Sequence, residues 1–126
     1  MKFSQETRIA VWEKYDKHCA YCGKEIEYKK MQIDHIYPVF RNYTNAELER
    51  YKRNRGEHNI ENFNPSCARC NRWKSTFTLE QFRKEISLQI DRLNRDNNNY
   101  RMAIDFGLIQ EIYIPVKFYF EIVKLS

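Results

Sequence analysis

The sequence predicts an α+β domain whose loops are fixed by a four-cysteine zinc site. The first observation is a pair of Cys-x-x-Cys motifs, at residues 19–22 and 67–70, far apart in the chain. The second is an alternation of apolar and polar residues over 25–28 and 31–36, which is typical of strands. The third is a helical repeat of apolar residues over 79–95. Together they predict a small mixed core followed by a mainly helical C-terminal extension.

The length and composition fit one small basic domain. The chain has 126 residues, of which 42% are hydrophobic and 15% aromatic, enough for a single core rich in ring packing. Lysine and arginine number 22 against 17 acidic residues, so the formal net charge is +5. This charge suits a polyanionic partner, although a solubilising surface charge explains it about as well.

All four cysteines belong to the two Cys-x-x-Cys pairs. Residues 1–6 are polar and lead into no apolar run, so we expect no signal peptide, no membrane span and a reduced, cytoplasmic chain. In that setting paired cysteines predict a structural Zn²⁺ site rather than disulfides. Four thiolates complete a tetrahedron, so His18 is only a substitute ligand. The predicted zinc ligands are Cys19, Cys22, Cys67 and Cys70.

The N-terminal part of the chain is predicted to form a helix, a zinc knuckle and two strands. Ser4 can cap a helix over residues 5–16 that leads to the first cysteine pair. The two strands then cover 25–28 and 31–36. Pro38 ends the second strand because it cannot donate a hydrogen bond to a sheet.

Capping patterns predict the later helices. Residues 44–47 fit a capping box before a helix over 45–54. Residues 100–106 are predicted as a short helix after the longer one over 79–95. Residues 112–123 alternate as an edge strand does, and a helix is the open alternative there.

Four short motifs follow one another between residues 15 and 76. They are Cys19-x-x-Cys22, Asp34-His35-Ile36-x-Pro38, Asn62 five residues before Cys67, and Cys67-x-x-Cys70-Asn71-x-x-Lys74. In this order they resemble the HNH endonuclease family, in its four-cysteine zinc branch. The resemblance implies a ββα-metal finger around one catalytic divalent ion, within a nuclease core of residues 1–76. Residues 77–126 are then an extension that packs on the core or on a second copy, as in a homodimer.

The resemblance also implies a role for each motif residue. His35 would be the general base that takes a proton from water, and Asp34 and Asn71 would hold the catalytic ion. Asn62 would tie down the loop so that His35 is oriented. Asn71 stands where the family often has histidine, and helix capping is its alternative role. His58 lies off the family positions and competes as a base or third ligand.

The chemistry of phosphodiester hydrolysis agrees with these roles. A neutral histidine with an ordinary pKa of about 6.5 can accept the proton of water at neutral pH. A hard divalent ion on a carboxylate and an amide oxygen keeps positions open for phosphate and water. We therefore expect a hydrolase that uses Mg²⁺ or Mn²⁺ on DNA, with RNA not excluded. The alternatives are a non-catalytic zinc-knuckle module that binds nucleic acid and a structural zinc protein that assembles through its tail.

Basic residues lie on both sides of the motifs, and they suit contacts with phosphate groups. A solvated helix face is the competing explanation for those near residues 41–55. The residues predicted to contact nucleic acid are Arg41, Arg53, Arg55, Arg72 and Lys74.

Two substitutions separate the structural ion from the catalytic site. Cys67→Ser removes one thiolate from a site whose binding free energy is about 10–16 kcal/mol, so the variant should unfold or loosen the whole core. His35→Ala should keep its melting temperature nearly unchanged and lose cleavage. Circular dichroism melts of both variants test this, and equal melting temperatures would contradict separate roles for the two metals.

Overall fold

The computed structural model describes residues 2–124, which fall into two compact units. The first unit contains the chain up to Leu79 and again from Lys117, and the second contains Glu80–Val116. The extension expected over 77–126 is therefore divided: the part from Lys117 belongs to the first unit, and Glu80–Val116 forms the second. Packing of the extension on a second copy stays a prediction.

Helix α1 (Gln5–Glu13) confirms the predicted N-terminal helix. Its cap is Ser4, whose side chain accepts a hydrogen bond from the Thr7 amide at 3.1 Å. The helix ends before residue 16 because Asp16 and Lys17 adopt positive φ angles of 52° and 67°, which no α-helix accommodates.

A two-stranded antiparallel sheet lies at the centre of the first unit. Strand β1 (Gln32–His35) confirms the prediction over 31–36, and its partner is β2 (Phe63–Ser66). A long segment, residues 36–59, leaves the sheet after β1 and returns before β2, and we call it the excursion. The register pairs Gln32 with Ser66, Ile33 with Pro65, Asp34 with Asn64 and His35 with Phe63.

The strand predicted over 25–28 is wrong. Glu25 forms an isolated bridge with His18, and Tyr28 begins a short 3₁₀ helix, η1 (Tyr28–Lys30). The reason is that the Ile26 amide donates to the Lys17 carbonyl at 2.8 Å, so this segment pairs with the knuckle instead of β1.

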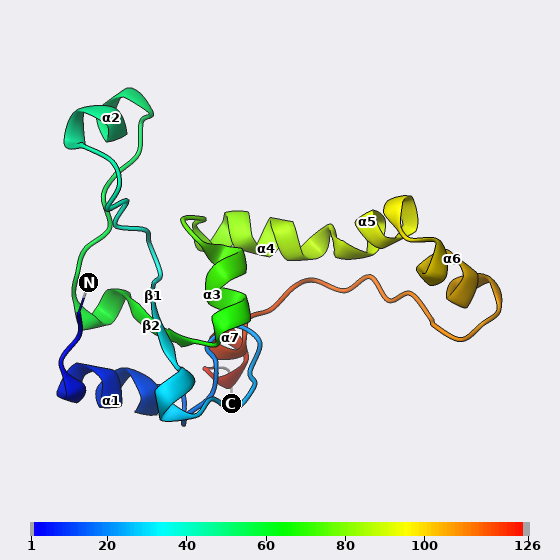
Figure 1. Cartoon of the computed structure of the whole chain (residues 1–126), viewed down its shortest axis with the longest axis horizontal. Helices are drawn as coiled ribbons and strands as arrows, with labels where there is room; N and C mark the ends of the chain where they lie inside the picture. Colours follow the sequence, from blue (N-terminus) through cyan, green and yellow to red (C-terminus); the bar gives the residue numbers. More distant parts are fainter. Residues whose placement is uncertain (1, 125–126) are drawn as a thin grey trace. The chain divides into compact units, whose positions relative to one another are not determined.

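Helix α3 (Ala68–Lys74) completes a ββα arrangement with β1 and β2 (Figure 1). It follows the 3₁₀ helix η2 (Ile60–Asn62) and strand β2, and Cys67 caps it. The predicted α+β class with a ββα finger and clustered cysteines is thus confirmed.

Helix α2 (Asn45–Arg50) lies on the excursion between β1 and η2 (Figure 1). The capping box is present, with Thr44 Oγ1 accepting from the Glu47 amide at 3.1 Å and Glu47 Oε1 accepting from the Thr44 amide at 3.0 Å. Where the excursion returns, the Gly56 amide donates to the Pro38 carbonyl at 2.8 Å.

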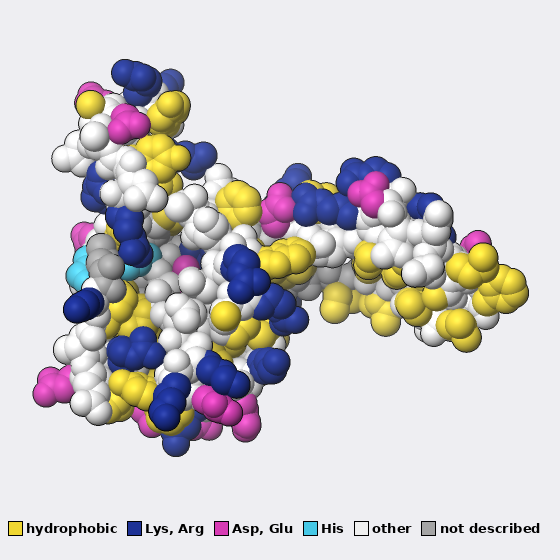
Figure 2. Space-filling model, viewed as in Figure 1, with side chains coloured by type: hydrophobic (Ala, Val, Ile, Leu, Met, Phe, Trp, Pro, Cys, Tyr) yellow, Lys and Arg dark blue, Asp and Glu magenta, His cyan; other side chains and the backbone are white. Residues whose placement is uncertain are grey.

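The second unit contains most of α4 (Leu79–Ser87), then α5 (Gln89–Asp96) and α6 (Asn98–Asp105). The single helix predicted over 79–95 is therefore divided, at Leu88, whose φ of −90° and ψ of 0° leave helical geometry. Several apolar side chains of this unit are exposed, and they appear yellow in Figure 2. They include Met102, Phe106, Leu108, Ile112 and Ile114.

The edge strand predicted over 112–123 is wrong, and the helical alternative is right for its end. Helix α7 (Tyr119–Val123) begins where Glu121 Oε1 accepts from the Phe118 amide at 2.9 Å. The amide of Tyr119 donates to the Tyr21 carbonyl at 3.0 Å, which ties α7 to the first knuckle. Among the residues from 2 to 124, no helix is long and apolar enough to cross a membrane.

We expect Gly56→Ala to destabilise the fold by more than about 1 kcal/mol, because a Cβ at this position would collide with backbone oxygens. The colliding atoms are the carbonyl oxygens of Tyr37 and Pro38, which cannot move as a flexible side chain can. Urea unfolding of the zinc-loaded chain measures the effect, with Asn54→Ala as the neighbouring control. Equal stability of the two variants would show that the excursion opens freely at this point.

Candidate active site and zinc site

The four cysteines come together in space although the two pairs are far apart in sequence. Their Sγ atoms all lie within 4.8 Å of one another. The Sγ atoms of Cys22 and Cys67 are 3.9 Å apart, close to the roughly 3.8 Å expected between thiolates on a tetrahedral zinc ion. This separation excludes a disulfide, and the donor set fits zinc.

Backbone amides point at the sulfur atoms. The Cys67 amide donates to Cys19 Sγ and the Cys70 amide to Cys67 Sγ, both at 3.4 Å. A hydrogen bond from the Cys70 thiol lowers the pKa of Cys19 to about 4. Burial raises the pKa of Cys22, and the hydrogen bond with Cys19 raises the pKa of Cys70, so the thiolate form is favoured at Cys19 in particular.

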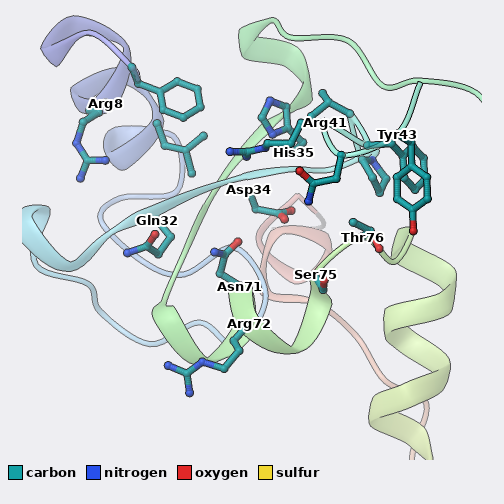
Figure 3. A pocket seen from close by; sticks show the side chains of 16 residues that line it. Arg8, Gln32, Asp34, His35, Arg41, Tyr43, Asn71, Arg72, Ser75 and Thr76 are labelled. Atoms are coloured by element: carbon teal, nitrogen blue, oxygen red, sulfur yellow. The ribbon is translucent and has the colours of Figure 1, made fainter. Parts of the chain in front are cut away.

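A cleft of about 720 Å³ lies beside β1 and α3 (Figure 3). Three predicted site residues line it: the predicted base His35 and the predicted metal ligand Asp34 from the end of β1, and the predicted metal ligand Asn71 from α3. A regular strand predicts opposite faces for Asp34 and His35, yet both are buried, with exposures of 4% and 7%, and both reach the cleft. The fold thus brings a carboxylate, an imidazole and an amide into one space.

Asp34 is held by two buried side chains. The hydroxyl of Tyr21 donates to its Oδ2, and the Lys74 ammonium lies 3.1 Å from Oδ2 and 3.3 Å from Oδ1. Burial raises the pKa of Asp34, and the charge of Lys74 opposes that rise. Burial also lowers the pKa of Lys74 and raises that of Tyr21. The carboxylate therefore sits in a low-dielectric network.

The nucleic-acid contact predicted for Lys74 is wrong in this fold. Its side chain has 0% exposure, and its ammonium also donates to the His35 carbonyl at 2.9 Å. The sequence placed it on an early turn of a helix but could not tell which face of α3 packs on β1. Lys74 thus fastens α3 to β1.

His35 contacts a second histidine. Its Nε2 lies 3.0 Å from Nδ1 of His58, and Phe63 packs edge-on against it with ring centroids 5.2 Å apart. Burial lowers the pKa of His35 to about 4, with further lowering from the charges of His58, Arg41 and others. The imidazole is thus held in its neutral form at neutral pH.

The side chain of Asn62 connects the start of the excursion, just after β1, with its end, just before η2. Its Oδ1 accepts from the Tyr37 amide at 2.9 Å, and its Nδ2 donates to the carbonyls of Tyr37 at 3.0 Å and Glu57 at 2.7 Å. The contact with the Glu57 carbonyl fixes the residue before His58. The pairing of His58 with His35 was missed in the sequence, where only its position four residues before Asn62 hints at it.

The predicted basic contacts divide into three groups. Arg41 and Arg72 are exposed and line the cleft, whereas Arg53 is exposed outside it. The phosphate contact predicted for Arg55 does not fit, because all five of its N–H donors are used within the chain. Their acceptors are the carbonyls of Val39, Phe40 and Tyr43 and, twice, Asn45 Oδ1. In Figure 2, other lysine and arginine side chains are scattered over the visible face of the first unit, including the region of α2.

The residues of the cleft fit a hard divalent ion by their donor chemistry. Asp34 offers a carboxylate and Asn71 an amide oxygen, which are ligands that Mg²⁺ and Mn²⁺ accept. Each carboxylate oxygen has two lone pairs, so Oδ1, which accepts only from Lys74, keeps one for a metal. An ion there would share the carboxylate with the lysine.

Comparison with known proteins agrees with the geometry. A family model described as HNH endonuclease matches residues 19–77, which include both cysteine pairs and all four cleft and loop positions. Residues 19–77 are therefore similar in sequence to the HNH endonuclease family. We call residues 19–77 the HNH segment, and both zinc knuckles lie inside it. No curated protein matches the sequence.

A solved structure resembles the chain beyond the HNH segment. The crystal structure of the Type II-C Cas9 enzyme from Actinomyces naeslundii superposes with a TM-score of 0.51 and 25% identity. The match covers 68% of this chain and 8% of that chain, so this chain corresponds to a small part of that enzyme. The likeness therefore supports a shared fold over the matched part of the chain.

Removal of the buried ammonium tests whether Lys74 is a structural partner of Asp34. We expect Lys74→Met to lower the free energy of unfolding by about 3–5 kcal/mol at pH 7, since it leaves a buried carboxylate unpaired. The loss should shrink at lower pH, where Asp34 can protonate, and in the double variant Lys74→Met with Asp34→Asn. Urea unfolding measures it, with exposed Lys24→Met as the control; equal stabilities would show that the pair contributes nothing.

Proposed function

We propose that this chain is a metal-dependent endonuclease that hydrolyses phosphodiester bonds of DNA. The observation that supports it most is the shared cleft, in which His35, Asp34 and Asn71 lie with the exposed guanidinium groups of Arg41 and Arg72. Similarity to the HNH endonuclease family supports nuclease chemistry. A binding module has no use for a neutral histidine beside a buried carboxylate.

His35 acts as the general base in this proposal. It removes a proton from water, and the hydroxide oxygen attacks phosphorus in line with the leaving oxygen of the sugar. Asp34 and Asn71 hold the divalent ion, which supplies positive charge to the phosphate oxygens when bound. Asn62 holds the excursion at Tyr37 and Glu57, and so keeps the end of β1 in place.

The substrate is proposed from the charge around the cleft. Arg41 and Arg72 are always ionised and present planar donors that suit phosphate oxygens. These contacts read the backbone, so they support binding to any polynucleotide. DNA is the substrate that we propose, and cleavage of an RNA of matching sequence, measured in parallel, tests the competing substrate.

Nicking of supercoiled plasmid DNA tests the proposal. Wild type should cleave with Mg²⁺ or Mn²⁺, and His35→Ala should lose at least about 100-fold in rate because it has no general base. Both proteins should bind a DNA duplex equally, and Lys24→Met should cleave normally. Binding by wild type without cleavage in either metal would instead identify a zinc-knuckle binding module.

The pH dependence follows from the environment of His35. Burial and neighbouring positive charges lower its pKa to about 4, so the base stays deprotonated as the pH falls below its ordinary value. We expect kcat/KM at saturating Mn²⁺ to decline on the acid side with a midpoint well below about 6.5. A midpoint at or above 6.5 would show that His35 titrates like a solvated histidine.

A further inference from the structure

We propose that His58 is a positioning residue for His35, accepting a hydrogen bond at Nδ1 from the Nε2–H of His35. This contact holds His35 in the tautomer whose Nδ1 is unprotonated. The contact between the two rings stands on geometry alone. The direction of the hydrogen bond and its importance for cleavage rest on the proposed function, in which His35 is the base.

The two imidazoles are fixed in a defined orientation. Nε2 of His35 and Nδ1 of His58 are 3.0 Å apart, a normal hydrogen-bond distance, with ring centroids 5.2 Å apart and planes inclined by 34°. Phe63 packs edge-on against both rings, at centroid distances of 5.2 Å and 5.0 Å. The ring centroid of Phe3 lies 6.2 Å from that of His35 and 5.4 Å from that of His58. Both histidines therefore pack against the same two aromatic rings.

The loop that carries His58 is held on both sides by Asn62. The side chain of Asn62 donates to the carbonyl of Glu57, directly before His58, at 2.7 Å. The amide of Asn62 donates to the carbonyl of Asn59, directly after His58, at 2.9 Å. Since the same side chain also binds both backbone groups of Tyr37, one asparagine ties the His58 loop to the chain leaving β1.

The position of the cleft decides which nitrogen can act as the base. His35 lines the cleft and His58 does not. Nε2 of His35 is engaged with His58, so Nδ1 is the nitrogen left to accept a proton from water in the cleft. A neutral imidazole carries one proton, and the nitrogen without it is the acceptor. With Nε2–H donated to His58, the lone pair is on Nδ1. The opposite assignment would protonate Nδ1 and remove the base.

The same hydrogen bond persists through proton transfer. When a water O–H bond breaks and an Nδ1–H bond forms, His35 becomes an imidazolium with both nitrogens protonated. Its Nε2–H still donates to Nδ1 of His58, so no partner has to change. Histidines that act in catalysis are commonly oriented by a group on the second nitrogen, and His58 is that group here.

Nitrogen NMR of the zinc-loaded full chain, without added Mg²⁺ or Mn²⁺, tests the tautomer directly. The chain has only three histidines, so ¹⁵N-histidine labelling with single variants assigns every ring. At pH 7.5 we expect His35 to be protonated at Nε2 and unprotonated at Nδ1. His58→Ala should give a mixture of tautomers, and His58→Asn, whose Oδ1 replaces Nδ1 as acceptor, should restore the single tautomer.

A kinetic arm connects the contact to cleavage. We expect His58→Ala to lower kcat between about 10- and 100-fold with KM for DNA unchanged, and His58→Asn to recover most of the loss. Glu61→Gln, in η2 directly after the His58 loop and exposed, is the matched control. Melting temperatures of all variants identify any loss of folding, which His58→Asn should avoid.

Two outcomes would overturn the inference: a wild-type His35 protonated at Nδ1, or an unchanged His35 tautomer in His58→Ala. Failure of the proposed function has a different signature. In that case the tautomer depends on His58 as expected, while wild type cleaves neither DNA nor RNA with any divalent ion.

Discussion

The buried contact between Lys74 and β1 determines how the site is assembled. Its ammonium reaches the Asp34 carboxylate and the His35 carbonyl, and both partners are nearly or fully removed from solvent. A buried charge without a partner costs several kcal/mol, so α3 can approach β1 only in the arrangement that keeps the pair. Asn71 lies one turn before Lys74 on the same helix. The arrangement that satisfies the lysine therefore brings the amide to the carboxylate.

Two further crosslinks hold the loops that packing alone would leave free. The cysteine cluster joins the first knuckle to the start of α3, and it also fixes Tyr21, whose hydroxyl binds Asp34. Asn62 closes the other end, where the chain leaves β1 and returns toward β2. A core this small has little apolar surface to bury, so a metal site and a few buried polar contacts provide the rigidity that a larger core would supply.

This rigidity explains how one histidine remains neutral beside several cations. His35 is buried, and His58, Arg41 and Lys74 all favour its uncharged form. In the proposed function, a base with a low pKa is a weak one in water, but a divalent ion held by Asp34 and Asn71 would also lower the pKa of its bound water. Proton transfer is efficient when the pKa of the base and that of the bound water are close. The aromatic rings of Phe63 and Phe3 keep the imidazole of His35 in place.

The sequence by itself determined the features that depend on residue type and short spacing. The thiolate pairs and the caps at Ser4 and Thr44 follow from local chemistry, and the Asp-His and Asn motifs were identified by the resemblance to a known family. Only the tertiary structure decided what these residues face. In the structure β1 pairs with β2 instead of residues 25–28, and the side chain of Lys74 is buried against Asp34. All N–H donors of Arg55 bond within the chain, and His58 contacts His35. Strand partners and side-chain burial depend on contacts between distant segments, and no local pattern of residues encodes those contacts.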